Sequence, residues 1–495
     1  MICIPIIANN LEDALHDMAE ASKVADIIEL RLDYIKKPDP KRLLESRTRP
    51  VIVTNRPIRE GGKYDGSEEE RIALLKLAIQ LQADFVDVEH DSIQNIRRDT
   101  EHRVPTKIIV SYHNFRETPG DLTAIYQKLS QYGADVIKIV TYANDITDNV
   151  KIYRLLRQTQ TPTISFCMGE HGIISRILYK KFGSYLTFAS LRVGKESAPG
   201  QVCIEELLNI YRTRNQDKNT AVYGLIGNPV SHSISPIIHN TLFKEMNFNS
   251  IYVPFKVEKI GDFIKGFRGL DVKGYSVTIP HKESVISHLD AIDPIAKKIG
   301  AVNTIVNRDG QLIGFNTDCD AAIKVLEGMD QVSATAAKDD RLKGKKVALI
   351  GAGGAARAIA FGLKEHGAQI TIINRNYERA QSLAKDVGCL FRKFDDLQSI
   401  EADILINATP VGMFPKVNET PIDKNKLKPN MGVFDTIYNP IETKLLRDAK
   451  AQGCKVVGGL PMFVHQAAAQ FKLWTGLTPP LELIRDIAYK KLLGG

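Results

Sequence analysis

Eight short runs of apolar and β-branched residues recur along the first part of the chain, and stretches of helical length separate them. The runs occupy residues 2–7, 27–33, 51–56, 85–89, 107–113, 136–141, 163–168 and 187–191. The clearest stretch between them, 68–82, carries apolar residues at the three- and four-residue spacing of a helix. Strands that alternate with helices indicate a parallel β/α architecture, and eight such units predict a closed (β/α)8 barrel over residues 1–213.

Charged and polar residues lie at or just after the ends of these runs, where a barrel of this kind places its chemistry. They are Glu29, Arg31, Asp33, Arg56, Asp87, Glu89, His113, Lys138, Arg176, Ser197 and Gln201. Any one of these residues, taken alone, also fits a structural ion pair across the mouth of the barrel. The whole set favours an active site, because burying so many unpaired charges would be costly.

Lys138 lies inside an apolar run rather than on a surface helix. Burial and neighbouring cations would lower the pKa of a lysine in such a place, which leaves an amine able to form an imine with a ketone. His113, one strand away, could take a proton from the carbon beside the imine and return one to a leaving hydroxyl group. We expect Glu89 to orient the imidazole and the arginines to hold a substrate carboxylate in bidentate fashion.

Several of these residues belong to segments that follow one another in a recognisable order. They are Glu29-Leu-Arg-Leu-Asp33, Asp87-Val-Glu89, Ser111-Tyr-His113, Val136-Ile-Lys138, Ile174-Ser-Arg176 and Ser197-Ala-Pro-Gly-Gln201. In order and spacing, residues 1–212 resemble type I 3-dehydroquinate dehydratase. The resemblance implies a Schiff base on Lys138, His113 as the acid and base with help from Glu89, and neither a metal nor an organic cofactor. The residues it implies for binding substrate are Glu29, Arg31, Arg56, Arg176, Ser197 and Gln201, with 197–201 covering the substrate. A lysine-imine aldolase is the alternative for this barrel.

A polar stretch without apolar periodicity, 212–220, predicts a linker, and a second one, 331–346, predicts a hinge between domains. The chain then runs from an apolar strand into Gly351-x-Gly353-x-x-Ala356 and a helix over 357–366. In this pattern the first glycine allows a tight turn, the second lets a pyrophosphate approach the backbone, and the alanine lets the helix pack close to the strand. The helix N-terminus then faces the phosphates, so this part predicts a Rossmann domain that binds a dinucleotide.

The strand after this helix, 369–373, ends on Asn374 and Arg375, and Arg379 follows one turn later. An acidic residue at this place would bind the ribose 2′-hydroxyl group of NAD, whereas an arginine offers a bidentate partner for a 2′-phosphate. The sequence therefore predicts NADP(H) as the cofactor.

Between the linker and the glycine turn lie polar residues that one by one fit helix caps and turns. Together they supply the hydroxyl, amide, ammonium and carboxylate groups that suit a polyhydroxy acid. The motifs are 228–236, 274–282, 300–304 and 316–318, and 407–413, 435–440 and 459–467 follow the turn. In these motifs the chain resembles shikimate dehydrogenase from about residue 221 to the C-terminus. Ala321 departs from this pattern, because the family often has glycine there.

The second resemblance implies that Lys282 and Asp318 form the catalytic pair. The residues it implies for binding shikimate or 3-dehydroshikimate are Ser233, Ser235, Thr278, Asn303, Asp318, Tyr438 and Gln466. The residues it implies for NADP are Gly351, Gly353, Gly354, Ala355, Asn374, Arg375 and Arg379, with Thr409, Met413 and Gly459 near the nicotinamide. It also implies a substrate-binding domain made of 221–330 and 460–495, and an NADP-binding domain over 331–459.

The two halves would share an intermediate. The first would dehydrate 3-dehydroquinate to 3-dehydroshikimate, and the second would reduce this ketone to shikimate with NADPH, as in the biosynthesis of aromatic amino acids. Two alternatives remain: a quinate/shikimate dehydrogenase with a catabolic role, which would use quinate with NAD, and a non-catalytic binding paralogue. Arg375 disfavours the first, and the presence of Lys138, His113, Lys282 and Asp318 disfavours the second.

Composition narrows the setting of these reactions. The six cysteines lie far apart without metal-ligand spacing, which indicates reduced thiols and no metal site. The net charge of +8 comes without a basic, aromatic-rich run, so we expect small anionic substrates and no nucleic acid partner. No apolar run is long enough to cross a membrane, and no signal peptide precedes the first strand. We expect a cytoplasmic protein, although a removed plastid transit peptide would leave no trace; the oligomeric state stays open.

Overall fold

The computed structural model describes residues 1–97, 105–329, 341–394 and 401–494 of the chain. These residues form two compact units, one made of Met1–Tyr223 and Asn247–Asp271 and the other of Gly224–Met246 and Val272–Gly495. Most of the predicted hinge at 331–346 lies outside the described residues.

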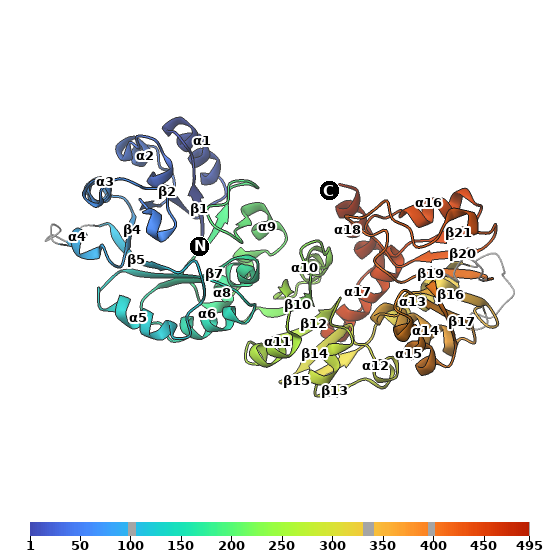
Figure 1. Ribbon diagram of the computed structural model, residues 1–495. Coiled ribbons are helices and arrows are strands. Elements are labelled where there is room, and N and C mark those ends of the chain that lie inside the picture. The colour runs from blue at the N-terminus through green and yellow to red at the C-terminus, as the bar shows by residue number, and fades with distance from the viewer. Residues whose placement is uncertain (98–104, 330–340, 395–400, 495) are drawn as a thin grey trace. The chain divides into compact units, whose positions relative to one another are not determined.

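The first unit contains the eight predicted strands (Figure 1). They are β1 (Ile2–Ile6), β2 (Ile27–Arg31), β3 (Val51–Thr54), β4 (Phe85–Glu89), β5 (Lys107–His113), β6 (Val136–Tyr142), β7 (Thr163–Met168) and β8 (Thr187–Ser190). All neighbouring pairs are parallel, in the order β7-β6-β5-β4-β3-β2-β1-β8, and a short strand β9 (Val202–Cys203) pairs with β8 in parallel. Between β8 and β7, the N–H group of Tyr185 donates to the carbonyl of Thr163 at 2.8 Å.

One buried cluster draws side chains from all eight strands, so the strands enclose a common core. Its members include Cys3, Ile27, Ile52, Phe85, Ile109, Val136, Ile164 and Phe188. The helices between the strands lie around the outside (Figure 1). They are α1 (Leu11–Ser22), α2 (Pro40–Glu45), α3 (Glu68–Gln80), α4 (Ile93–Arg97), α5 (Leu122–Ser130), α6 (Asp148–Leu156), α7 (Ile173–Ile177), α8 (Tyr179–Phe182) and α9 (Ile204–Asn209). The predicted (β/α)8 fold is confirmed.

Several predicted elements end one or two residues earlier than the apolar pattern suggested. β2 ends at Arg31 because a 3-10 turn, Leu32–Tyr34, follows it, and β3 ends at Thr54. Helix α3 ends at Gln80, and Gln82 adopts the left-handed region with φ 57°, which a continuing helix does not allow. Asp33 and Arg56 therefore lie in the connections after their strands, on the side of the barrel where active sites are built.

A six-stranded sheet follows the linker, in the order β11-β10-β12-β14-β15-β13. Its strands are β10 (Ala221–Gly227), β11 (Ser250–Lys256), β12 (Val272–Val277), β13 (Ala291–Ile292), β14 (Thr304–Arg308) and β15 (Gln311–Phe315). The helices of this region are α10 (Ser235–Glu245), α11 (Ile260–Phe267), α12 (Pro294–Ile299) and α13 (Asp318–Met329). Strands β12 and β14, and β14 and β15, pair in antiparallel fashion.

A second six-stranded sheet is parallel throughout, in the order β18-β17-β16-β19-β20-β21. Its strands are β16 (Lys346–Ile350), β17 (Gln369–Asn374), β18 (Leu390–Lys393), β19 (Ile404–Asn407), β20 (Gly432–Asp435) and β21 (Lys455–Val457). The helices of this sheet are α14 (Gly354–Glu365), α15 (Tyr377–Val387) and α16 (Lys444–Ala451), whereas α17 (Leu460–Thr475) packs against α13, β12 and β14 and α18 (Leu481–Leu493) packs against α10 and α17. This is the order of a Rossmann sheet, which binds ligands beside its first strand, where the direction of winding reverses.

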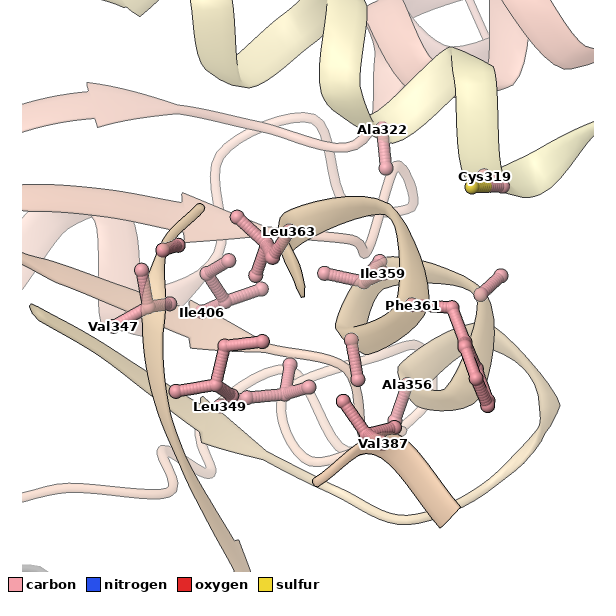
Figure 2. Close-up of a cluster of buried hydrophobic side chains, with 14 of the residues drawn as sticks. Cys319, Ala322, Val347, Leu349, Ala356, Ile359, Phe361, Leu363, Val387 and Ile406 are labelled. Carbon is pink, nitrogen blue, oxygen red and sulfur yellow. The ribbon is translucent and has the colours of Figure 1, made fainter. Parts of the chain in front are cut away.

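Buried side chains hold α14 against this sheet (Figure 2). Ile359 and Leu363 of the helix pack with Leu349 of β16 and Ile406 of β19. On the other side of α14, a Cβ atom at Gly362 would lie 2.8 Å from Ile323 and 3.0 Å from Cys319 of α13. The close approach of the two helices thus depends on a glycine of α14, while Ala321 in α13 is accommodated in the same core.

Candidate active sites

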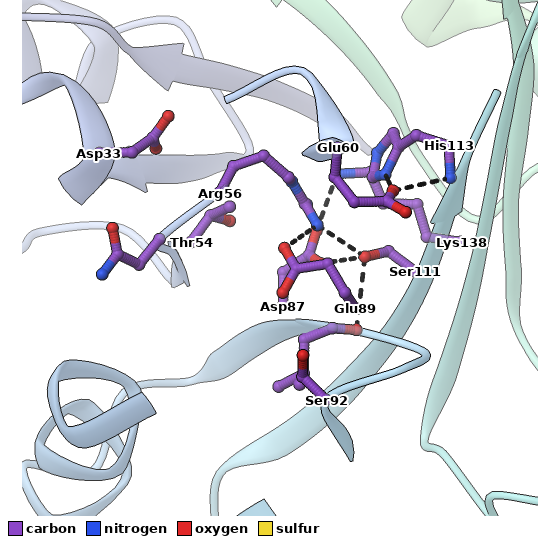
Figure 3. Close-up of polar contacts among 12 residues, drawn as sticks. Asp33, Thr54, Arg56, Glu60, Asp87, Glu89, Ser92, Ser111, His113 and Lys138 are labelled. Carbon is purple, nitrogen blue, oxygen red and sulfur yellow. Dashed lines mark hydrogen bonds and ion pairs between the residues drawn. The ribbon is translucent and has the colours of Figure 1, made fainter. Parts of the chain in front are cut away.

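Lys138 is buried inside the barrel, with 5% of its surface exposed, and lies among carboxylates (Figure 3). Its Nζ atom is 2.8 Å from Asp87 Oδ2, 3.6 Å from Glu29 Oε1 and 4.6 Å above the ring of Phe188. Arg56 binds the same carboxylate oxygen of Asp87, so this cation lies near the amine of Lys138 through a shared carboxylate.

Arg56 joins two buried carboxylates of β4. Its Nη2 atom is 2.7 Å from Asp87 Oδ2, and its Nη1 atom is 2.6 Å from Glu89 Oε1. Nη1 also donates to Ser111 Oγ, whose hydroxyl group donates to Asp87 Oδ1 at 2.6 Å. Burial opposes ionisation of Asp87, but Arg56 and Lys138 together hold its pKa well below the ordinary value.

Glu89 does not take the predicted place at the imidazole. Its Oε1 atom faces Arg56 and its Oε2 atom accepts a hydrogen bond from Arg71 Nη1 at 2.6 Å. The carboxylate at His113 belongs to Glu60, whose Oε2 atom is 3.0 Å from Nδ1 and also accepts the backbone N–H of His113 (Figure 3). Among the hydrogen bonds of the described residues, none joins Glu89 directly to the imidazole of His113.

The Glu60–His113 pair is electrostatically unusual. Burial raises the pKa of Glu60 to about 7. Burial, followed by the charges of Arg56 and Lys138, holds the pKa of His113 well below its ordinary value, which keeps the imidazole neutral. Sequence reasoning missed Glu60 because it follows β3 in a 3-10 turn, Ile58–Glu60, rather than ending a strand. Its position in the connection after β3 was the available signal.

The predicted arginines differ in what they already bind. The guanidinium of Arg31 pairs with Asp33 at 2.9 and 2.7 Å, and that of Arg56 pairs with Asp87 and Glu89. Arg176, 1% exposed, lies 4.2 Å above the ring of Phe166, and its Nε and Nη2 atoms have no hydrogen-bond partner among the described residues. Burial lowers the pKa of Arg176 to about 9. Arg176 is thus the buried cation that an anionic ligand could satisfy.

Ser197 and Gln201 face each other in the connection before β9. Gln201 Oε1 accepts the backbone N–H of Ser197 at 2.6 Å and its hydroxyl group at 3.2 Å. The Nε2 atom of Gln201 is buried without a partner within the described part of the chain. Like Nε and Nη2 of Arg176, this amide is a buried donor without a partner among the described residues, and such donors suit a ligand rich in acceptor oxygens.

In the second unit, Lys282 and Asp318 form the predicted pair. Lys282 Nζ lies 2.5 Å from Asp318 Oδ2. Asp318 begins α13, and Asn316 Oδ1 accepts the N–H groups of Asp318 and Cys319 there. Asn303 Nδ2 donates to Asp318 Oδ1 at 2.9 Å, so the carboxylate is oriented by an amide on one side and an ammonium on the other.

A chain of hydrogen bonds extends from Asn303, beside the Lys282–Asp318 pair, to helix α17. Asn303 also donates to Thr317 Oγ1, whose hydroxyl group donates to the carbonyl of Gln466 at 3.3 Å. Gln470, which sequence reasoning missed, donates from Nε2 to the carbonyl of Asn303 at 3.2 Å. No charge distinguishes this glutamine in the sequence; only its burial in α17 at 3% exposure does so.

A separate group contains the predicted serines and tyrosine. Ser233 Oγ accepts the N–H of Ser235 at 3.2 Å. Burial raises the pKa of Tyr438 to about 12, while a hydrogen bond with Ser233 opposes the rise. Thr278, half-buried, packs where a Cβ atom at Gly227 would come within 2.4 Å of its methyl group.

The glycine turn has the geometry that a pyrophosphate requires. Gly351 adopts φ 123°, and a Cβ atom there would lie 2.8 Å from the carbonyl oxygen of Ala408. A Cβ atom at Gly353 would meet nothing within 4 Å, so this side of the turn is open. At Gly354 a Cβ atom would lie 2.8 Å from Lys282 Cβ, which places the start of α14 directly against the side chain of Lys282.

The remaining cofactor residues lie beyond β17 and β19. Arg375 is exposed, and its side chain makes no hydrogen bond or ion pair within the described ranges. Arg379 pairs with Glu283 at 2.9 Å, and Asn374 donates to the carbonyl of Asn376. Around the predicted nicotinamide region, Thr409 donates to Asn407 at 2.7 Å, Met413 is 36% exposed, and a Cβ atom at Gly459 would lie 2.1 Å from the carbonyl oxygen of Thr436. Ala355 is half-buried at the start of α14.

Neither a metal site nor a membrane-spanning helix is present among the described residues. No group of three His, Cys, Asp or Glu side chains there could hold a metal ion. No helix in the same ranges is long and apolar enough to cross a membrane.

Comparison with known families assigns the two candidate sites to two different families. Residues 2–218 match the model of type I 3-dehydroquinase. Residues 225–305 match the shikimate dehydrogenase substrate-binding domain, 333–430 match shikimate/quinate 5-dehydrogenase, and 459–489 match the shikimate 5'-dehydrogenase C-terminal domain.

Individual relatives agree. The bifunctional 3-dehydroquinate dehydratase/shikimate dehydrogenase, chloroplastic, of Arabidopsis thaliana is 42% identical over 99% of this chain and 84% of its own length. The NADP(+) shikimate dehydrogenase of Bacillus mycoides is 41% identical over 55% of this chain and 99% of its own. A shikimate dehydrogenase solved in complex with NADP+ is 41% identical, with a TM-score of 0.51, over 56% of this chain and 97% of its own. The chain therefore belongs to the family of bifunctional 3-dehydroquinate dehydratase/shikimate dehydrogenases.

Proposed function

We propose that the barrel dehydrates 3-dehydroquinate to 3-dehydroshikimate through a Schiff base on Lys138, and that the second half reduces 3-dehydroshikimate to shikimate with NADPH. The observation that carries the first step is a buried lysine, Lys138, one strand away from a neutral buried imidazole, His113. The observation that carries the second is the Lys282–Asp318 pair against the start of α14.

The dehydration follows from the amine and the imidazole. The lone pair of Lys138 Nζ attacks the ketone carbon, and loss of water from the adduct leaves a protonated imine. The imine acidifies the adjacent C–H bond, and His113 takes that proton. The electrons form the new C=C bond as the β-hydroxyl group leaves as water with the proton returned from His113. Water then hydrolyses the imine, which releases the product ketone and the free amine.

The other residues of the barrel hold this chemistry in place. Glu60 fixes the orientation of the His113 ring through Nδ1, so that its other nitrogen faces the substrate. Arg176, with Gln201 and Ser197, binds the substrate carboxylate, because its guanidinium is buried and its Nε and Nη2 atoms have no hydrogen-bond partner in the described part of the chain. We assign the substrate hydroxyl groups to Glu29, Arg31 and Arg56, at the positions that the family resemblance implies.

In the second half, Lys282 donates a proton to the oxygen of the ketone as it becomes an alkoxide, and Asp318 keeps the ammonium in position. Bound NADPH supplies the hydride. The turn at Gly351 and Gly353 receives the pyrophosphate at the N-terminus of α14, and Arg375 receives the 2′-phosphate. Ser233, Ser235, Thr278, Asn303, Tyr438 and Gln466 remain the proposed contacts to shikimate.

One assay tests both activities together. Purified protein given 3-dehydroquinate and NADPH should form shikimate, and borohydride with 3-dehydroquinate should leave the mass of the substrate on Lys138. Lys138→Ala should abolish dehydration and leave shikimate oxidation intact. An adduct on another lysine would refute the Schiff base, and quinate with NAD as the best substrate pair would refute the assignment of the second half.

We also propose the setting of these reactions. The substrates are small anions, which agrees with the net charge of +8, and we expect neither nucleic acid nor a membrane as partner. The proposed domains are 1–213, 221–330 with 460–495, and 331–459. We expect the enzyme in the cytoplasm or, after removal of a transit peptide, in a plastid. A binding study with duplex DNA and lipid vesicles tests the first expectation.

A further inference from the structure

A series of ion pairs links the outside of the barrel to Lys138. Glu68, with 35% of its side chain exposed, pairs with Arg71 at 2.6 Å, and Arg71 pairs with Glu89 at 2.6 Å. Glu89 pairs in turn with Arg56, which reaches Lys138 through Asp87. Figure 3 shows the inner part of this series. Charges alternate along it, so each buried ion is compensated by its neighbours.

Arg71 is the least expected member of the series. It lies in the first turns of α3, a helix on the outside of the barrel, yet its side chain is only 1% exposed. Its Nη1 atom donates to Glu89 Oε2 and to the carbonyl of Asn55 at 3.0 Å, while Nε and Nη2 donate to Glu68 at 2.9 and 2.6 Å. The guanidinium is therefore held on both sides, and it satisfies the one Glu89 oxygen that Arg56 leaves free.

Two cations pair with the same oxygen, Asp87 Oδ2: Arg56 Nη2 lies 2.7 Å from it and Lys138 Nζ lies 2.8 Å from it. Without the charge of Arg71, Glu89 would be under-compensated, and the region around Lys138 would become more negative by one charge. Added negative charge favours the protonated form of a neighbouring amine, and an ammonium cannot attack a ketone. The titratable groups that face Lys138 are Cys3, Glu29, Asp87 and His113 from other strands and Arg56 from the connection after β3.

We propose that Arg71 is a positioning residue for the dehydration: it compensates Glu89, keeps Arg56 on Asp87, and thereby lets the amine of Lys138 leave Asp87 as a neutral nucleophile. The role rests on the proposed Schiff base. It also gives Glu89 a function without contact to the imidazole.

The test compares variants that change the buried charge in opposite directions. Arg71→Met removes a positive charge, and Glu89→Gln removes a negative one. Arg71→Lys keeps the positive charge but loses the planar guanidinium that donates to two carboxylates at once. The measured quantity is the single-turnover rate at which 3-dehydroquinate becomes trappable by borohydride on Lys138, followed against pH. We expect the acidic limb of this profile to move up by about one pH unit in Arg71→Met and down in Glu89→Gln. In Arg71→Lys the rate should fall while the limb stays at the wild-type pH.

A merely structural role predicts a different result. Loosened packing lowers the rate without moving the acidic limb, or it moves the acidic limb in the same direction in Arg71→Met and Glu89→Gln. An unmoved limb in Arg71→Met with a native circular dichroism spectrum overturns the proposal. If Arg71→Met does not fold, the other two variants decide, and an unmoved or raised limb in Glu89→Gln, or a displaced limb in Arg71→Lys, overturns it. An adduct on another lysine in the wild-type protein refutes the Schiff base itself; trapping on Lys138 with unmoved limbs refutes only the role of Arg71.

Discussion

Glu60 Oε2 lies 3.0 Å from His113 Nδ1, and the same oxygen accepts the backbone N–H of His113 at 3.1 Å. One carboxylate thus fixes both the main chain and the ring of the imidazole. Phe115 stacks on that ring with a centroid distance of 6.1 Å. It also lies where a Cβ atom at Gly61 would be 2.1 Å from its Cζ atom, so the turn that carries Glu60 requires glycine at a φ of 74°.

Replacing Glu60 should slow the dehydration without weakening substrate binding. Glu60→Gln should lower kcat by about 100-fold and change KM little, because the imidazole loses the charge that orients it. Burial raises the pKa of Glu60 to about 7, so the carboxylate ionises as pH rises through that value. The wild-type kcat should therefore rise across this range, and the rise should be absent in Glu60→Gln. Steady-state rates from pH 5.5 to 9 provide the measurement, with the exposed Glu45→Gln as the matched control.

Replacing Arg176 should separate binding from stability. Arg176→Met should raise KM for 3-dehydroquinate by about 10- to 100-fold, since a hydrogen bond to a charged group contributes about 1.5–3 kcal/mol. The same change removes a buried cation whose Nε and Nη2 atoms have no partner among the described residues, so Tm should stay the same or increase. Calorimetry and initial rates check both parts. A lower Tm with unchanged KM would mean that Arg176 is structural.

Two neighbouring glycines should respond differently to alanine. Gly353→Ala should leave Tm unchanged, because a Cβ atom meets nothing within 4 Å, yet it should weaken NADPH binding by occupying the open side of the turn. Gly354→Ala should lower kcat for shikimate oxidation, because its Cβ atom would press on Lys282 at 2.8 Å. Thermal melts with fluorescence titration of NADPH distinguish the two. Equal NADPH affinity in Gly353→Ala and the wild type would contradict the proposed pyrophosphate site.

Arg375 should select between the two nicotinamide cofactors. Arg375→Ser should raise KM for NADPH by about tenfold or more and leave KM for NADH unchanged, because only NADPH carries the 2′-phosphate. The fold should be unaffected, since the side chain is exposed. The measurement is KM for NADPH and for NADH in the wild type and in Arg375→Ser. An equal rise in KM for NADH would exclude a role specific to the 2′-phosphate.

Removing Lys282 should affect only the second activity. Lys282→Met should lower kcat for shikimate oxidation by about 100-fold or more while dehydration of 3-dehydroquinate continues at the wild-type rate. Asp318→Asn should cause a smaller loss, because Asn303 donates to Oδ1 and the ammonium loses only one partner. Loss of both activities in a folded variant would contradict independent sites.

The sequence by itself determined the strands and the chemistry they carry. The bounds of β4, β5 and β7 match the predicted runs, because a buried parallel strand is mostly apolar and turn residues end it. Lys138, His113, Lys282 and the glycine turn were likewise visible, since an ammonium in an apolar strand and a G-x-G-x-x-A pattern each have few structural explanations.

Only the tertiary structure decided which charges neutralise one another. Asp87 and Glu89 alternate on one strand and both point inward, so the sequence offered Glu89 as readily as any other carboxylate for His113. Distances in the folded chain instead pair Glu89 with Arg56 and Arg71, leave Nε and Nη2 of Arg176 without a hydrogen-bond partner among the described residues, and bring Glu60 to the imidazole from a turn. Ion pairing depends on separations of a few ångströms between residues far apart in the chain, and spacing along the sequence does not contain that information.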